Sequence, residues 1–381
     1  MKAAILYNKF FDHDGTNRLI GGVETYLLNL AGLCRELNLE TTIYQWSNAP
    51  FIKNFDGVEI RGVPVNHLAL GKRNKALFQE ASKDLDKQRD IIIFGADHVS
   101  VPTDSPRHIS IQHGVSWDLP VEYMTDRVIV KYEWAAKLKK WRSITQYRQC
   151  FENCKNTVCV DYNFLNWYRT TITREIEGHH IWIIPNFSQV ASEEQITRRK
   201  YDNEVVRILF ARRFERIRGT RLIADTANCL LGRNNKVRFT FAGEGPEEEW
   251  LQERFASEER VCFQRYTPDK ALDIHLRHDI AVIPSLASEG TSLSVAEAMA
   301  AGCSVVASAV GGITNMIIDM YNGILVMPDS NSFLNALDYL ISCPELRQSI
   351  SSRAYHTAKE SFSLERWKQS WQSVLTQVMN G

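Results

Sequence analysis

The chain has 381 residues, which is long enough for two hydrophobic cores. Hydrophobic residues make up 44% and charged residues 24%, as in folded globular proteins, so the composition excludes a disordered chain. Lys plus Arg and Asp plus Glu both total 45, so the chain lacks the basic surplus that binding to nucleic-acid phosphates requires. We therefore expect a two-domain protein without a nucleic-acid partner.

The N-terminus and the cysteines indicate a cytoplasmic protein. The first apolar run, residues 3–7, is too short for a signal peptide, and no run approaches the roughly 20 apolar residues that span a bilayer. Cys150, Cys154 and Cys159 lie close in the sequence but without a CxxC spacing. We interpret them as reduced packing residues, with a zinc site or a disulfide as the alternative.

Short apolar runs alternate with helical patterns through the first half of the chain. Residues 23–37 have apolar side chains at helical spacing. The expected strands are residues 1–7, 39–46, 90–96, 108–114, 156–161 and 181–186. This alternation is typical of a parallel sheet that has helices on both faces.

The same pattern restarts after a polar segment, residues 188–204, which we interpret as a linker. The expected elements are strands at 205–213, 237–243, 261–266, 279–285, 303–309 and 323–328, and a helix at 220–231. Residues 362–379 predict one amphipathic closing helix. We therefore expect Rossmann-like, doubly wound α/β domains at 1–187 and 205–360, followed by a closing segment at 361–381.

The segment that follows the expected strand at 279–285 has the residue types of a phosphate and sugar site. Glu289 and Glu297 are eight residues apart, so on one helix they would point about 80° apart and would not converge. We therefore place Glu289 in a loop and Glu297 on the next helix. The turn between them consists of Gly290, Thr291, Ser292 and Leu293.

Such a turn presents free backbone N–H groups and the positive end of a helix dipole to an anion. A carboxylate one or two turns into the helix can accept paired hydrogen bonds from vicinal hydroxyls such as those of a ribose. Together these features fit a nucleoside diphosphate that carries a sugar. The alternative is a capped helix with two incidental surface glutamates.

Several further short motifs accompany this segment. They are Gly21-Gly22, His113-Gly114, Pro185-Asn186, Arg213, Arg218-Gly219 and Ala242-Gly243-Glu244-Gly245-Pro246. In this combination and order the motifs resemble those of the family-4 retaining glycosyltransferases of the GT-B fold, over nearly the whole chain. The resemblance implies two facing Rossmann-like domains with a cleft between them, the first on the acceptor side and the second binding the nucleotide-sugar donor.

The resemblance also implies catalytic roles. Arg213 and Arg218 would hold the donor diphosphate, because preorganised cations stabilise the charge that grows on the leaving group. Glu289 would lie beside the transferred sugar, and His113 would orient that sugar.

The remaining matching residues would bind the donor. Glu297 would hold the ribose hydroxyls. Gly21 and Gly22 would let the backbone approach the phosphates, because glycine has no side chain. The backbone amides of the turn Gly290, Thr291, Ser292 and Leu293 would contact phosphate or sugar hydroxyls.

Three positions depart from the family pattern. Arg212 stands where the family commonly has Gly and adds a cation at the strand end. Gln264-Arg265 replaces a frequent Gly near the expected nucleotide base. Thr291-Ser292 replaces a frequent Phe-Gly, which changes the sugar pocket.

The implied reaction moves a hexose-type sugar, with retention of configuration, from a nucleoside-diphosphate sugar to an acceptor hydroxyl. The expected acceptor is a glycan or lipid-linked glycan in bacterial-type surface polysaccharide synthesis. No cofactor and no metal are expected. The alternatives are a phosphorylase or a nucleotide-sugar epimerase of the same fold, or a catalytically silent nucleotide-sugar binding protein.

Other polar patterns have simpler interpretations. Asp84-Leu85-Asp86 resembles an Asp-x-Asp metal motif, but we interpret it as the solvated face of a charged helix. His275 and His278 are three residues apart without an evident third ligand, which favours packing. Gly243-Glu244-Gly245 lacks the third glycine of a dinucleotide fingerprint.

Residues 127–148 combine seven basic residues and one acidic residue with interleaved aromatic side chains. A basic aromatic segment of this kind can rest on an anionic membrane, which would place the protein at the inner membrane face. The alternative is a solvated helix face with buried tryptophans.

Overall fold

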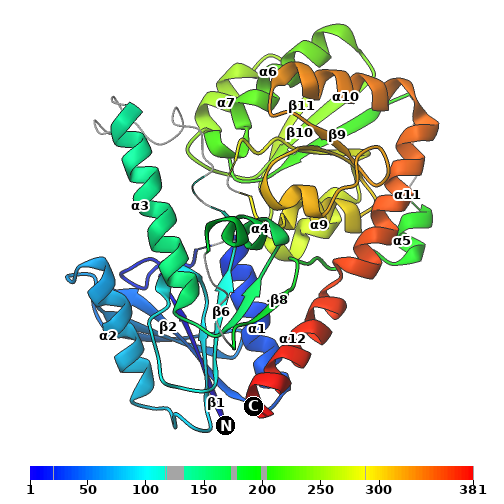
Figure 1. Ribbon diagram of the computed structural model, residues 1–381. Helices are drawn as coiled ribbons and strands as arrows, with labels where there is room; N and C mark the ends of the chain where they lie inside the picture. The colour runs from blue at the N-terminus through cyan, green and yellow to red at the C-terminus, as the bar shows by residue number, and fades with distance from the viewer. Residues whose placement is uncertain are drawn as a thin grey trace. The chain divides into compact units, whose positions relative to one another are not determined.

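The computed structural model describes residues 1–19, 21–115, 117, 133–172, 178–198, 204–287 and 289–380 (Figure 1). The chain folds into two compact units. The N-terminal unit contains Met1–His113, Lys137–Ile184 and Lys368–Gly381, and the C-terminal unit contains Gly114–Ala136 and Pro185–Trp367. The end of the chain therefore returns to the unit in which the chain begins.

The N-terminal unit is built on a sheet with eight strands among the described residues. They are β1 Lys2–Tyr7, β2 Glu40–Ser47, β3 Phe51–Phe55, β4 Val58–Pro64, β5 Ile91–Phe94, β6 His108–Gln112, β7 Asn156–Cys159 and β8 His180–Ile183. The order is β3-β4-β2-β1-β5-β6-β7-β8, and every pair is parallel except β3 and β4. The order reverses between β1 and β5, and at such points α/β sheets bind ligands beyond the carboxyl ends of the strands.

Helices connect these strands (Figure 1). They are α1 Gly22–Glu36, α2 Leu70–Ser82, the short η1 Asp97–Val99, α3 Glu133–Glu152 and α4 Tyr162–Thr171. Asp161 caps α4, because its carboxylate accepts hydrogen bonds from the backbone N–H groups of Asn163 and Phe164.

The C-terminal unit has a sheet with six described strands, all parallel. They are β9 Val206–Ala211, β10 Val237–Ala242, β11 Val261–Gln264, β12 Ile280–Ile283, β13 Ser304–Ser308 and β14 Ile324–Val326. Their order is β11-β10-β9-β12-β13-β14, so the order reverses between β9 and β12. The carboxyl ends of β9 and β12 are therefore the expected ligand-binding edge of this unit.

The described helices of this part of the chain follow in sequence. They are α5 Glu193–Arg198, η4 Arg216–Arg218, α6 Thr220–Arg233, α7 Glu248–Arg254, η5 Pro268–Lys270, α8 Ala271–His275, α9 Leu293–Ala300, η6 Gly311–Asn315, α10 Ser330–Ser342, α11 Pro344–Ser361 and α12 Leu364–Asn380.

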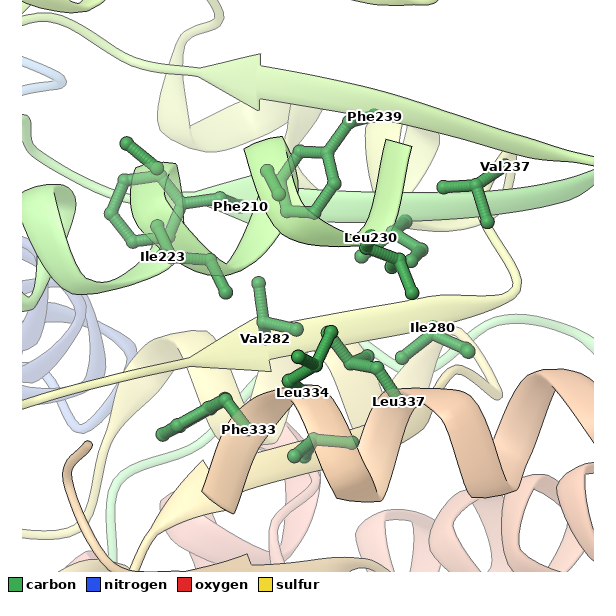
Figure 2. Packing of buried hydrophobic residues seen from close by; sticks show 14 of the residues in the cluster. Phe210, Ile223, Leu230, Val237, Phe239, Ile280, Val282, Phe333, Leu334 and Leu337 are labelled. Carbon is green, nitrogen blue, oxygen red and sulfur yellow. The ribbon is translucent and has the colours of Figure 1, made fainter. Parts of the chain in front are cut away.

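The core of the C-terminal unit lies on both faces of its sheet. Figure 2 shows Phe210 of β9 and Phe239 of β10 close to Ile223 of α6, on a face that α10 also covers. Alternate strand residues, such as Leu209, pack on the opposite face. A strand that is buried on both faces reads as a continuous apolar run, which is why the sequence pattern predicts these strands.

The structure contains a hairpin that the sequence analysis missed. Strands β3 and β4 pair antiparallel through a turn at Asp56 and Gly57, whose φ angles are 50° and 74°. Positive φ at both central residues defines the type I′ turn that Asp-Gly favours. The Asp56-Gly57 pair, between two segments in which inward and outward residues alternate, was therefore the signal that could have predicted this hairpin. The hairpin adds an antiparallel edge strand to an otherwise parallel sheet.

The ends of the C-terminal unit also differ from the predicted linker and closing segment. The predicted linker, residues 188–204, includes helix α5, and Ser188 pairs with Ser363. Tyr355 donates a hydrogen bond to the Ala191 carbonyl at 2.9 Å. Residues 199–203 lie outside the described residues. The closing helix begins at Leu364, and from Lys368 onward it belongs to the N-terminal unit.

Candidate active site

The two predicted glutamates lie in the loop after β12 and on the helix α9 that follows it. The structure places Glu289 in the loop, with 5% of its surface exposed, and Glu297 on α9, as predicted. Ser292 is the N-cap residue of α9 and is almost fully buried. Ser288 lies outside the described residues.

Glu289 forms two ion pairs with arginines from the neighbouring β9–α6 loop. Its Oε1 accepts a hydrogen bond from Arg212 Nη2 at 2.5 Å, and its Oε2 accepts one from Arg218 Nη1. Burial by itself raises the pKa of Glu289, but the two guanidinium groups outweigh burial and hold that pKa below its usual value. Glu289 is therefore a buried carboxylate that stays charged.

Arg212 and Arg213 have different surroundings in the structure. The predicted residue, Arg213, has 64% of its side chain exposed and pairs with Glu215 at 3.0 Å. Arg212 has 6% exposed, and it donates hydrogen bonds to both Ser285 and Glu289.

Arg218, the second predicted arginine, does reach Glu289, and its side chain is 35% exposed. The next residue, Gly219, has φ of 78°, and a Cβ there would collide with the carbonyl oxygen of Pro284. The two loops also share a hydrogen bond from the Leu286 N–H to the Ile217 carbonyl at 3.0 Å. Glycine therefore allows the close approach of loops that brings Arg218 to Glu289.

The glycine turn after β10 supports the same arginine loop. A Cβ at Gly243 would collide with the carbonyl oxygen of Arg212. The Phe214 N–H donates to the Glu244 carbonyl at 2.9 Å. This turn therefore holds the backbone of the arginine loop.

Glu297 is half-buried in the second turn of α9. Burial raises its pKa to about 8, and the charge of Arg212 opposes that rise. The negative charge of Glu297 is among the causes that raise the pKa of Tyr266, after burial. Arg212 thus acts electrostatically on both predicted glutamates.

The turn at Thr291 and Ser292 is held by other parts of the unit. The Thr291 hydroxyl accepts a hydrogen bond from the Asn186 N–H at 2.9 Å, and the Asn186 side-chain amide donates to the Thr291 carbonyl. The Ser292 N–H donates to the Met316 sulfur at 3.2 Å. Asn186 is therefore a support for this turn, a role that the sequence analysis did not assign to the Pro-Asn motif.

In the N-terminal unit, Gly21 is the N-cap of α1 and Gly22 is the first residue of that helix. A Cβ at Gly21 would collide with the carboxylate of Glu24. Glu24 is buried and accepts a hydrogen bond from the Tyr7 hydroxyl at 3.3 Å. The sequence analysis did not select Glu24, although it follows the glycine pair by two residues.

His113 lies directly after β6, and its Nε2 is 2.8 Å from the carbonyl oxygen of Gly95. Burial lowers the pKa of His113 to about 4, so the imidazole is neutral near pH 7.

The other polar patterns have structural partners. Asp84 lies after α2 rather than on a helix, and it pairs with Arg61 at 2.7 Å. The Nδ1 atoms of His275 and His278 lie within hydrogen-bond distance of the carbonyls of Ala271 and Ile274. No group of three or more His, Cys, Asp or Glu side chains in the described residues is arranged to hold a metal.

The basic aromatic segment lies partly outside the described residues, which resume at 133. Helix α3 contains its second half. Trp134 and Trp141 are 67% and 62% exposed, and Leu138 between them is 42% exposed. The alternative interpretation, a solvated helix with buried tryptophans, is therefore wrong for these two residues.

Comparison with known proteins identifies the architecture. The chain superimposes on the crystal structure of Alr3699/HepE from Anabaena, in complex with UDP, with a TM-score of 0.70, 17% identity and coverage of 99% of this chain and 100% of that one. It superimposes on sucrose-phosphate synthase from Thermosynechococcus elongatus with a TM-score of 0.72, 15% identity and coverage of 100% and 99%. The fold is GT-B.

A protein-family comparison matches a region in the C-terminal half of this GT-B chain. Residues 192–357 match the family described as glycosyl transferases group 1. An uncharacterized glycosyltransferase of Methanocaldococcus jannaschii is 28% identical over 178 residues, 45% of this chain and 43% of the relative. The chain thus spans less than half the length of that relative. The matched region includes Arg212, Arg218, Glu289 and Glu297.

Proposed function

We propose that this GT-B protein is a retaining glycosyltransferase of family 4 that uses a nucleoside-diphosphate sugar as donor. The observation that carries the proposal is the ion-pair group that Arg212 and Arg218 form with the buried Glu289, beyond the carboxyl ends of β9 and β12. The match to the group 1 glycosyl transferases over the same residues and the UDP complex of the Anabaena protein support it.

The charges of this group fit a diphosphate. Two guanidinium groups face one carboxylate, so one positive charge is in excess. Arg212 is buried against Glu289, whereas Arg218 is about one-third exposed and can turn toward a ligand. Arginine can bind phosphate oxygens in a bidentate way. We therefore assign diphosphate binding to Arg218, with Arg212 keeping Glu289 charged beside the sugar.

The proposed reaction keeps the configuration at the anomeric carbon. The bond from that carbon to the phosphate oxygen breaks, and a bond to the acceptor oxygen forms on the same face. The proton of the acceptor hydroxyl goes to the leaving phosphate. The arginines stabilise the negative charge on the leaving group more strongly in the transition state than in the ground state, so no divalent cation is needed in this proposal.

Other residues complete the proposed donor site. Glu297 holds the ribose hydroxyls, and backbone N–H groups at the start of α9 face the phosphates. Gly21 and Gly22 of the N-terminal unit let its backbone approach the phosphates, and His113 orients the sugar. Because Nε2 of His113 donates to a carbonyl, its Nδ1 accepts a hydrogen bond from a sugar hydroxyl.

A thermal-shift panel with UDP, GDP, dTDP, ADP and NAD tests the donor site. A nucleoside diphosphate at about 100 times its dissociation constant should stabilise the protein by about 2.7 kcal/mol. The stabilisation should disappear in Glu297→Ala and remain in the exposed control Glu253→Ala. A shift with NAD alone, or with no nucleotide, would contradict the proposal.

Product analysis separates the proposed transfer from its alternatives. A glycosyltransferase releases nucleoside diphosphate and forms a glycoside only with an acceptor present, and NMR of the new anomeric proton gives the configuration. An epimerase would interconvert nucleotide sugars without an acceptor. A silent binding protein would bind the donor but would not turn it over, whichever acceptor is present.

We propose that the acceptor is a glycan on a lipid carrier and that α3 brings the protein to an anionic membrane surface. Trp134, Leu138 and Trp141 recur at helical spacing, so they share one exposed face of α3. Lys137, Lys139 and Arg142 are exposed beside that face and complement anionic head groups. Within the described residues, no helix is both long and apolar enough to span a membrane.

Co-sedimentation with vesicles tests the membrane proposal. The protein should bind vesicles that contain phosphatidylglycerol, more weakly at high salt, and should not bind pure phosphatidylcholine. Leu138→Ser with Trp141→Ser should weaken binding about tenfold, because apolar burial is lost. The matched control is Ile318→Ser with Met327→Ser, two apolar residues of the C-terminal unit that are each 66% exposed. Equal losses in both variants would contradict the proposal.

A further inference from the structure

The backbone around Gly95 determines which nitrogen of His113 carries the proton. The Gly95 N–H donates to the Leu6 carbonyl at 2.7 Å, which joins the end of β5 to β1. A Cβ at Gly95 would lie 2.8 Å from Leu27 Cδ1, so Leu27 of α1 packs closely against this glycine. The Gly95 carbonyl is therefore a fixed acceptor, and Nε2 of His113 must donate to it.

The ring of His113 also contacts an aromatic residue of α1. The rings of Tyr26 and His113 meet edge to face, with centroids 5.4 Å apart and planes at 87°. Tyr26 is completely buried. A rotation of the imidazole about its Cβ–Cγ bond would lose both the hydrogen bond to Gly95 and this ring contact.

The closing helix α12 in turn holds Tyr26. The indole Nε1–H of Trp371 donates to the Tyr26 hydroxyl at 2.7 Å, and Trp371 is completely buried. Lys368, in the same part of α12, pairs with Glu36 at the end of α1 at 2.5 Å. A chain of contacts therefore runs from the last helix through Tyr26 to His113.

We infer that Tyr26 and Trp371 are positioning residues, which hold the imidazole of His113 in one orientation and one tautomer toward the reacting sugar. This inference rests on the proposed function for its catalytic consequence. Its structural part concerns only the N-terminal unit and can be measured without any substrate.

The first experiment observes the imidazole directly. Protein labelled with ¹⁵N-histidine should show His113 as a single Nε2–H tautomer in a long-range ¹H–¹⁵N spectrum, assigned by its loss in His113→Gln. In Tyr26→Leu the signal should shift toward the average of two tautomers, whereas Tyr26→Phe, which keeps the ring but loses the hydrogen bond from Trp371, should cause a smaller shift. An unchanged His113 signal in Tyr26→Leu would overturn the inference.

The second experiment measures the consequence for catalysis. UDP-glucose and GDP-mannose are assayed in parallel, and the donor that is turned over is used. Tyr26→Leu should lower kcat about tenfold and leave the donor KM within about twofold, because small misplacements of a site group cost rate. In the His113→Ala background, Tyr26→Leu should cause no further loss.

Controls separate positioning from stability and from the proposed function. Phe164→Leu, another completely buried aromatic residue of the N-terminal unit, should lower Tm without lowering kcat. If Tyr26→Leu does not fold, Trp371→Phe makes a smaller change and should lower kcat about threefold, again only when His113 is present. Equal losses with and without His113 would show a structural role and overturn the inference. Full activity of His113→Ala would instead refute the proposed role of His113.

Discussion

Arg212 and Arg213 are neighbours in the sequence but have opposite surroundings. Arg212 is buried between Ser285 and Glu289, whereas Arg213 is largely exposed beside Glu215. Arg212→Ala should destabilise the protein by about 3–5 kcal/mol, because it leaves Glu289 with one partner in a buried site. Arg213→Ala should cost at most about 1 kcal/mol, as for a surface pair.

Urea unfolding gives the stabilities of these two variants, and donor turnover gives their activities. We expect Arg212→Ala to lose turnover and Arg213→Ala to retain most of it. The reverse result would assign the diphosphate-binding role to Arg213, as the motif predicts.

The pKa of Glu297 predicts a dependence of stability on pH. Because burial raises this pKa to about 8 in the folded protein, the folded state holds a proton that the unfolded state has already released. Stability should therefore fall as pH rises from about 4.5 to about 8. Glu297→Gln cannot release this proton. The Tm of the variant minus the Tm of the wild type should therefore increase as pH rises through the same range.

Differential scanning fluorimetry between pH 5 and pH 9 measures this difference without ligand. The exposed control Glu253→Gln should track the wild type at every pH. A constant difference between Glu297→Gln and the wild type would contradict the raised pKa.

The residue scale shows where sequence reasoning succeeds and where it does not. Glu289 and Glu297 could be assigned to a loop and a helix, because their spacing forbids convergence on one helix. Which of two adjacent arginines faces Glu289 depends on the direction of the strand end relative to the next loop, and the sequence does not contain that direction. Asn186 and Thr291 are 105 residues apart in the sequence, and their hydrogen bond is likewise set by packing.

At the scale of elements, helix α6 offers two glycines with opposite surroundings. Gly219, at its N-terminus, has φ of 78° and no room for a Cβ, whereas Gly232, near its C-terminus, has open space around it. Gly219→Ala should displace the arginine loop and weaken diphosphate binding at least tenfold. Gly232→Ala should leave binding unchanged and stabilise the protein by about 0.5–1 kcal/mol, because alanine favours a helix over glycine.

Isothermal titration with the diphosphate selected by the thermal-shift panel measures both variants. Unchanged affinity in Gly219→Ala would show that the arginine loop does not contribute to binding.

Whether a helix or strand can be predicted depends on how far apart in the sequence the residues that determine it lie. The buried strands of both units and the amphipathic α12 could be predicted, because apolar spacing is local. The sequence signal for the β3–β4 hairpin was also local, but its Asp56-Gly57 turn was overlooked. The exposure of Trp134 and Trp141 on α3 could not be derived, because burial of a helix face depends on what packs against it.

At the scale of the whole molecule, the two units should respond differently to donor fragments. A nucleoside diphosphate alone should protect the backbone amides of 213–219 and 289–297 in the C-terminal unit from hydrogen exchange. The intact donor should also protect the region of His113 in the N-terminal unit, because His113 is proposed to orient the sugar.

Hydrogen exchange detected by mass spectrometry tests this order of protection. Protection by the diphosphate that is confined to the N-terminal unit would contradict the assignment of donor binding to the C-terminal unit.

The sequence by itself determined that the chain has two α/β units and that the residues proposed to bind phosphate and sugar follow particular strands. Both properties come from local patterns, namely apolar spacing, glycine turns and carboxylate spacing. Only the tertiary structure decided that Lys368–Gly381 returns to the first unit, that Arg212 rather than Arg213 holds Glu289, and that Trp371 reaches Tyr26. These contacts join residues far apart in the chain, and packing selects them only when the whole chain is folded.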